Sequence, residues 1–467
     1  MYPNPGFVSA AWADDGGDGD GGDGDDGRDD RDDRDDSDDR DDDDGNDRSG
    51  HSGSRSSPAG QVDRFLRNIE RSLFGRNTQR RAPAQGAAPR RLDQQAPDEI
   101  AVFDLAAADL AVLETEGYSV LAAVTLNALA REMTRVQIPA GLTLEAARER
   151  VRALPSGQTA DFNHYYRAEQ QTPAVEPVAL PACQHENCRA WNSIAWPRAS
   201  RATGRCAVTV PIGMIDTGIN ATHEIIAGAN LEIIRLADET LEPSKAVHGT
   251  AVASVLIGSD QSRVPGLVRE AQVVAVDAFG RSVSDERADL ISVLRGIDLL
   301  AARDVKVINL SLAGPDNRLL LDAVNTLVND VGIAIVAAAG NAGPRAAPAY
   351  PARYAPVIAV TAVDTGARIY RRAQRGEHLD IAAPGVNLLA ATSVRGARLK
   401  TGTSFAVPYV TATAAVLLSV DPSRTPRDVA DWLAANARDL GSEGQDEIFG
   451  WGMLQTQGVC NAQRTQP

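Results

Sequence analysis

Three short motifs carry side chains that together could perform nucleophilic catalysis. Asp216 precedes Thr-Gly at the end of an apolar run, His248 precedes Gly-Thr, and Ser404 lies within Gly-Thr-Ser-Phe-Ala-Val-Pro. A serine hydroxyl is a weak nucleophile that needs a base, and a histidine base needs a carboxylate to fix its tautomer. We therefore predict an Asp216, His248 and Ser404 triad. Each motif taken alone is more typical of a turn, a helix cap or a loop.

The elements that must position these residues lie between residues 205 and 460, where short Val/Ile/Ala-rich runs alternate with helix-like stretches. This alternation predicts an α/β fold with a parallel sheet covered by helices on both faces. In such sheets the ligand site lies beyond the carboxyl ends of the strands, which is where the three motifs stand. The expected strands are 207–215, 231–236, 272–278, 305–312, 332–339 and 357–363, and the expected helices are 249–256, 285–302, 318–330 and 404–420.

The three motifs, in this order and separated by 32 and 156 residues, resemble the signature blocks of the subtilisin-like serine peptidases, the peptidase S8 or subtilase family. The resemblance covers 205–460. It implies a serine endopeptidase that hydrolyses peptide bonds of extended polypeptides through an acyl-enzyme.

The resemblance also implies further site residues. The Asn341 side chain and the Ser404 N–H would hold the oxyanion. Phe405 and Val407 depart from the residues usual in the family and bear on pocket shape only. The substrate backbone would pair with Leu310, Ser311, Leu312, Ala313 and Gly314, and Ala338, Ala339 and Gly340 would wall the pocket before the scissile bond.

Residues 99–167 predict a small α+β domain of the ferredoxin-like βαββαβ type. The expected strands are 100–105, 118–124, 130–138 and 161–166, with helices at 107–116 and after Thr143, which is a suitable N-cap. The domain loosely resembles the family's propeptide, an intramolecular inhibitor. The segment 168–204 is expected to be an exposed connection suited to autocleavage.

The N-terminal 60 residues form an acidic tail that is expected to be disordered. Residues 14–48 hold 20 Asp and 5 Arg, so that stretch carries a net charge of −15 out of −16 for the whole chain. The nearly neutral remainder argues against a nucleic-acid partner. Weak calcium association is the alternative interpretation of the tail. Residues 1–13 end in Ala-Trp-Ala and are either a signal-peptide remnant or a stretch without meaning. A basic linker with a short amphipathic helix is expected at 61–98, and a C-terminal tail at 461–467.

Four cysteines allow three pairings. We favour Cys206–Cys460, which would join the two ends of the predicted catalytic domain, together with Cys183–Cys188. Two alternatives stay open, a metal site that includes His185 and four reduced thiols. Disulfides fit an exported protein, so we expect a secreted, periplasmic or extracellular location.

The expected partners are polypeptide substrates and the chain's own propeptide, and we expect a monomer. The sequence contains no run of 18 or more apolar residues, so we expect no membrane-spanning helix. No cofactor is expected for the chemistry, and the sequence does not reveal whether structural calcium binds. Two alternative functions stay open. One is a maturation or regulatory protease of narrow specificity, and the other is a non-catalytic peptide-binding protein of the same fold.

Overall fold

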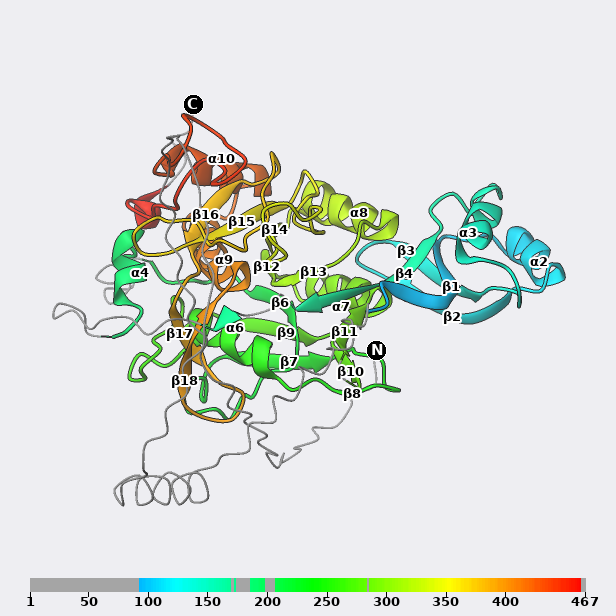
Figure 1. Cartoon of the computed structure of the whole chain (residues 1–467), viewed down its shortest axis with the longest axis horizontal. Helices are drawn as coiled ribbons and strands as arrows, with labels where there is room; N and C mark the ends of the chain where they lie inside the picture. The colour runs from blue at the N-terminus through cyan, green and yellow to red at the C-terminus, as the bar shows by residue number, and fades with distance from the viewer. Residues whose placement is uncertain (1–91, 169–171, 174–184, 198–205, 284, 463–467) are drawn as a thin grey trace, which may run out of the picture. The chain divides into compact units, whose positions relative to one another are not determined.

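A parallel sheet of seven strands lies at the centre of the larger part of the protein (Figure 1). The computed structural model describes residues 92–168, 172–173, 185–197, 206–283 and 285–462. The predicted tail at 1–60 and nearly all of the linker at 61–98 lie outside these residues. Across the sheet, the strands are β16 (Ile381–Pro384), β15 (Ile358–Val363), β14 (Ala334–Ala338), β12 (Val307–Leu310), β6 (Ile212–Asp216), β9 (Val273–Asp277) and β7 (Leu231–Arg235).

Both faces of this sheet are buried except along the edge strand β7, which explains why its inner strands are mainly apolar rather than alternating. Along β9, Val273 and Ala275 point into one hydrophobic core, whereas Val274 and Val276 point into the other. The first core also contains side chains of α6 (Val247–Ile257), α9 (Thr403–Val420) and α10 (Pro426–Asn436), and the second contains side chains of α7 (Leu290–Ala302) and α8 (Arg318–Asn325). The prediction of a parallel sheet between helices is confirmed.

The helix α9 is long and apolar enough to cross a membrane, but 89% of its length is buried inside the protein. It is the core helix that packs under the sheet, and no other described helix passes the same test.

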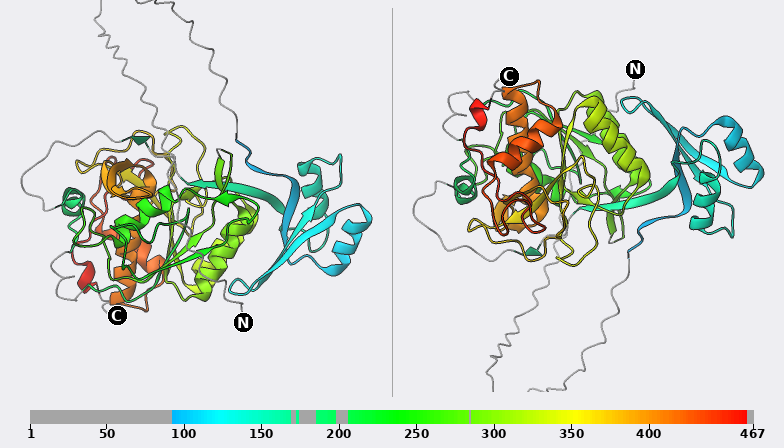
Figure 2. Two further views of the ribbon diagram at one scale, coloured as in Figure 1. Left: turned by 90° about the horizontal axis from the view of Figure 1, so that it is seen from below. Right: turned by 90° about the horizontal axis from the view of Figure 1, so that it is seen from above.

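The residues from 95 to 168 have the βαββαβ order that was predicted. Their antiparallel sheet runs β2–β3–β1–β4, and both helices pack on one of its faces (Figure 2). Ile100 and Val102 face these helices, while Ala101 and Phe103 join the core formed with α7 and α8. The elements are β1 (Gln95–Phe103), α2 (Ala107–Thr115), β2 (Ser119–Leu126), β3 (Arg131–Gln137), α3 (Leu144–Arg152) and β4 (Asp161–Ala168). As predicted, Thr143 caps α3 by accepting a bond from the Ala146 N–H at 3.2 Å.

Several short elements surround the main sheet. A third sheet runs β17–β18–β5, and β10 pairs with both β8 and β11. These elements are β5 (Thr172–Pro173), α4 (Cys188–Ser193), β8 (Glu242–Pro243), β10 (Gly280–Ser282), β11 (Asp285–Asp289), β13 (Leu312–Ala313), the π-helix η1 (Thr326–Val331), β17 (Leu388–Ala391), β18 (Ala397–Thr401) and the 3₁₀-helix η2 (Val459–Asn461).

The helix predicted at 285–302 begins five residues later than expected. The Asp289 carboxylate accepts a bond from the Ser292 N–H at 2.8 Å, so Asp289 is the N-cap of α7. The residues before it are extended and form β11. The predicted strand 305–312 is also divided, into β12 and β13, and the predicted helix 318–330 ends as a π-helix before Gly332.

Part of the segment 168–204, expected to be an exposed connection, is instead buried. In α4 the side chain of Cys188 has no exposed surface, and neither does Ile194, which follows the helix. The Asn187 amide exchanges two hydrogen bonds with the Leu389 backbone, both at 2.8 Å. The expectation of an exposed linker is therefore wrong for 185–197, because this stretch closes the core beneath β17.

A disulfide joins Cys206 to Cys460, as the favoured pairing required. It connects residues 254 apart in sequence and closes the two ends of the α/β part. Cys188 is also disulfide-bonded, whereas Cys183 lies outside the described residues.

A partly buried carboxyl makes stability depend on pH. Burial raises the pKa of Asp380 to about 7, although the Ala359 N–H donates to its Oδ2 at 2.7 Å. Because this pKa is higher in the folded than in the unfolded chain, the contribution to stability is present at acid pH. It is lost as the pH rises from about 4 to 7.

We therefore expect Asp380→Asn, which keeps an acceptor for Ala359, to flatten this dependence. The difference in unfolding free energy between pH 5 and pH 8 should fall by about 2 kcal/mol relative to wild type, measured by urea denaturation. Equal pH profiles for the two proteins would contradict the assignment.

Candidate active site

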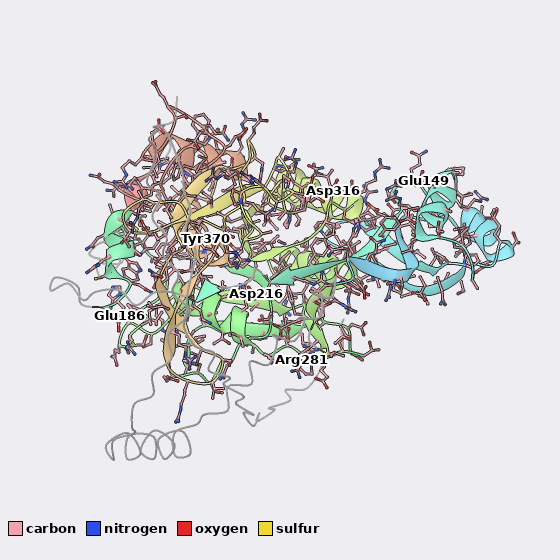
Figure 3. All side chains as sticks on the ribbon, viewed as in Figure 1. Glu149, Glu186, Asp216, Arg281, Asp316 and Tyr370 are labelled. Carbon is pink, nitrogen blue, oxygen red and sulfur yellow. A yellow bond between two sulfur atoms is a disulfide. The ribbon has the colours of Figure 1, made fainter. Side chains whose placement is uncertain are left out.

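Asp216 is the last residue of β6 (Figure 3), and its carboxylate forms a buried pair with the ring of His248. His248 Nδ1 lies 2.7 Å from Asp216 Oδ1, and the two residues are 4% and 1% exposed. The Thr217 N–H donates to the same oxygen at 2.7 Å. This geometry holds the imidazole in one orientation, with its Nε2 directed away from Asp216. Nε2 is buried and has no hydrogen-bond partner among the described residues.

The helix that carries His248 is bonded directly to the turn that carries Asp216. The Gly249 N–H donates to Thr217 Oγ1 at 2.8 Å. A Cβ at Gly249 would lie 2.3 Å from the Thr217 carbonyl oxygen, so only glycine permits this approach. Gly249 and Thr217 thus act together. Their contact sets how closely the His248 ring approaches the Asp216 carboxylate.

Ser404 lies in the first turn of α9, and the residue after it contacts the histidine. The His248 ring centroid is 5.9 Å from that of Phe405, the next residue after Ser404. Ser404 Oγ donates to the Ser311 carbonyl at 3.4 Å, and Ser311 Oγ donates to the Ser404 carbonyl at 3.2 Å. In this structure the hydroxyl thus faces the strand segment at Ser311. The side chain of Ser404 is fully buried.

Asn341 is joined to the beginning of α9 through Thr403. Its amide oxygen accepts bonds from the Thr403 N–H and hydroxyl, both at 3.0 Å. The Thr403 hydroxyl also accepts from the Gly340 N–H at 3.2 Å. These bonds determine which way the amide is turned, because its nitrogen then lies on the side of Gly402, 3.0 Å from where a Cβ would stand. The Asn341 amide nitrogen, a hydrogen-bond donor, therefore lies beside Gly402, which is two residues before Ser404 in the sequence.

The predicted substrate-pairing residues form the end of β12 and the short strand β13. Leu312 pairs with Ala168 and Ala313 pairs with Arg167, so β4 of the chain itself already lies along this strand in antiparallel register. Gly314 is bonded to Tyr350 through both backbone groups. Ala338 is the last residue of the neighbouring strand β14, Ala339 and Gly340 follow it, and all three are buried.

A second carboxylate lies beside Asp216, since Asp277 is its register partner on β9. Burial raises the pKa of Asp277, and the Arg235 guanidinium, which donates to Oδ2 at 2.7 Å, opposes this shift.

Sequence reasoning missed two hydroxyls that assemble the site, Thr217 and Thr403. Both stand inside the motifs, directly after Asp216 and directly before Ser404. Their positions were visible, but their partners are residues that become neighbours only in the fold. Among the described residues, no group of three or more His, Cys, Asp or Glu side chains could hold a metal ion.

Comparisons with known proteins agree with this geometry. The family model described as the subtilase family, Peptidase_S8, matches residues 208–452. The curated proteins that are similar in sequence include two from Bacillus. The minor extracellular protease Epr of Bacillus subtilis is 31% identical over 58% of this chain and 41% of its own length. Subtilisin DY of Bacillus licheniformis is 32% identical over 52% of this chain and 88% of its own length.

A solved structure extends the likeness in fold beyond the α/β part. Fervidolysin from Fervidobacterium pennivorans, described as a keratinolytic enzyme related to subtilisin, matches with a TM-score of 0.66. At 19% identity the alignment covers 81% of this chain and 63% of fervidolysin, and this supports the fold alone.

The contact between Gly249 and Thr217 leads to a prediction about stability. Gly249→Ala should lower the unfolding free energy by about 2–4 kcal/mol, because its methyl group would overlap a buried carbonyl oxygen. The measurement is urea unfolding in a Ser404→Ala background. The matched control is Gly366→Ala, whose nearest neighbour is a side-chain oxygen at 3.3 Å and which should change stability by less than about 0.5 kcal/mol. Similar losses for both variants would show that the close approach is not what requires glycine.

Proposed function

The chain belongs to the subtilase family of serine-type endopeptidases, and on this premise we propose that Asp216, His248 and Ser404 are its catalytic triad. The observation that carries the proposal is the 2.7 Å contact between Asp216 and His248 beside the first turn of α9. Ser404 Oγ attacks the scissile carbonyl carbon while His248 Nε2 takes the hydroxyl proton. His248 then donates that proton to the leaving amine, and water hydrolyses the resulting ester by the same route. Asp216 holds the imidazole and stabilises its protonated form.

The oxyanion of each tetrahedral intermediate is held by the Asn341 amide nitrogen and the Ser404 N–H. Support comes from the two bonds that Thr403 donates to Asn341 Oδ1, since an amide fixed at its oxygen needs no reorganisation as charge develops. The N-terminal end of α9 adds its partial positive charge at the same point.

Polypeptide substrates bind as an added antiparallel strand on β13, with residues Leu310 to Gly314 providing the backbone contacts. The support is that β4 already pairs with β13 in this way. The pocket for the residue before the scissile bond is walled by the residues from Ala338 to Gly340.

The domain at 99–167 is an intramolecular inhibitor, and the enzyme is made as a precursor. The support is twofold. The Ala168 and Arg167 backbones occupy the strand that a substrate would use, and Asp298 of α7 accepts backbone bonds from Asn127, Ala128 and Leu129. Autocleavage after Ala168 but before Asn187 would leave α4 with the mature enzyme, because α4 belongs to its core.

The mature enzyme acts outside the cytoplasm as a monomer and needs no cofactor for its chemistry. The Cys206–Cys460 bridge supports export, because such bonds persist in oxidising compartments.

The first test compares the purified wild type with Ser404→Ala by intact mass and N-terminal sequencing. Wild type should lose its residues up to a bond between Ala168 and Asn187, and Ser404→Ala should stay full length. A labelled fluorophosphonate should modify wild type at Ser404. A processed Ser404→Ala protein would contradict autocleavage, and a processed wild type that the probe does not label would favour the non-catalytic binding protein.

The second test separates oxyanion stabilisation from packing. Asn341→Ala should lower kcat by about 10²–10³ with little change in KM, a range carried over from subtilisin. Thr403→Val keeps the amide but removes the hydroxyl that orients it, so its kcat should fall by only about 10-fold. Equal losses in the two variants would assign Asn341 a purely structural role.

A further inference from the structure

The end of β4 lies between two strands of the α/β part and shows how a peptide would be bound there. On one side β4 pairs with β13, and on the other it pairs with β11, both antiparallel (Figure 1). The register partners are Ala168 with Leu312, Arg167 with Ala313, Tyr166 with Ala288, and Tyr165 with Asp289. A substrate that replaces β4 therefore meets side chains of β11 as well as the backbone of β13.

Successive side chains of β4 point to opposite faces of this sheet. Tyr166 points into the core, has no exposed surface, and donates its hydroxyl to the Pro315 carbonyl at 3.4 Å. Arg167 is only partly buried, and its guanidinium reaches Asp285, the first residue of β11.

The contact between Arg167 and Asp285 is bidentate. Nε donates to Oδ1 and Nη2 donates to Oδ2, both at 2.9 Å. Asp285 is 7% exposed, and its Oδ2 also accepts from Arg287 Nη1 at 2.8 Å. Burial acts to raise the pKa of Asp285, but the bonds from Arg167 and Arg287 outweigh burial and hold this pKa below its usual value. The carboxylate is thus built into β11 as an ionised acceptor for two guanidinium groups.

Only one of these two cations stays with β11 when β4 leaves. Arg287 belongs to β11 itself and bonds Oδ2 alone, so Oδ1 would lose its partner. A buried carboxylate oxygen without a donor is unfavourable, and a planar guanidinium on the incoming peptide restores both bonds. An ammonium group restores charge but not the forked geometry.

We propose that Asp285 determines specificity and selects substrates with arginine at the position that pairs with Ala313. The inference rests on the proposed function. That position is two residues before the substrate residue opposite Ser311, whose carbonyl contacts Ser404 Oγ. Arginine is preferred there to lysine, a neutral residue is weaker, and glutamate is weakest because it faces Asp285.

The test uses processed wild-type enzyme and quenched fluorescent peptides that differ only at this position, with arginine, citrulline, lysine or glutamate. Citrulline keeps the shape of arginine without its charge. We expect kcat/KM for the arginine peptide to exceed that for the citrulline peptide by about 10-fold. In Asp285→Asn the ratio should fall to about 1. In the control Glu286→Gln it should persist, because Glu286 bonds the Lys245 N–H instead.

The labelled fluorophosphonate measures the concentration of active enzyme. A failure of the inference about Asp285 can therefore be distinguished from a failure of the proposed function. Labelled wild type that cleaves the arginine and citrulline peptides equally would overturn the inference and leave the proposed function intact. If Asp285→Asn does not mature, Arg287→Gln replaces it. The arginine preference should then be equal or larger, because Asp285 has lost its competing cation, and a loss of preference would count against Asp285.

Absence of labelling would remove the proposed function, and the recognition of arginine is then judged without catalysis. In the full-length Ser404→Ala chain, Arg167→Gln should raise hydrogen exchange of the amides at 165–168 by about 10-fold. The same change should have little further effect when Asp285→Asn is already present. Additive effects of the two substitutions would show that the pair does not interact, which would overturn the inference.

Discussion

The site depends on hydrogen bonds that join the beginnings of two helices to the ends of strands in one parallel sheet. Thr217 bonds Gly249 and thereby sets α6 against β6, while Thr403 bonds Asn341 and Gly340 and sets α9 against β14. Carboxyl ends of parallel strands and amino ends of the following helices meet at the same edge of the sheet. Fixing the helices there brings the Asp216 carboxylate against the His248 ring and the first turn of α9 against the same ring, although these segments are far apart in sequence.

The three residues proposed as the triad are buried in the full-length chain. Asp216, His248 and Ser404 are each less than 5% exposed, and the adjacent strand β13 is already paired with β4. One strand, β4, serves two sheets. Its first half completes the small antiparallel sheet, and its second half lies between β11 and β13. Because those bonds are made by backbone groups, a different extended peptide can make them, and only side chains such as Arg167 distinguish one occupant from another.

Much of the architecture could be predicted because it follows from local patterns. The βαββαβ order and most strands of the large sheet follow from apolar periodicity and from turn residues, and the start of α3 was readable from Thr143. The failures also have local causes. Acidic residues at 285–289 were assigned to a helix although Asp289 is its cap, and 185–197 was assigned to an exposed linker although Cys188 and Ile194 are buried. In each case a distant partner, β4 for the first and β17 for the second, decided the outcome.

The sequence by itself determined the family and the residue types that the site was expected to contain, because the three motifs are specific in this order and spacing although each alone is not. It could not determine how those residues are held. The Thr217–Gly249 and Thr403–Asn341 bonds join residues 32 and 62 positions apart, and the Arg167–Asp285 pair joins residues 118 apart. Such contacts form only when the sheet brings separate segments together, so no local pattern records them. Only the structure therefore shows how the Asn341 amide is oriented, that β4 pairs with β13, and that Asp285 faces Arg167.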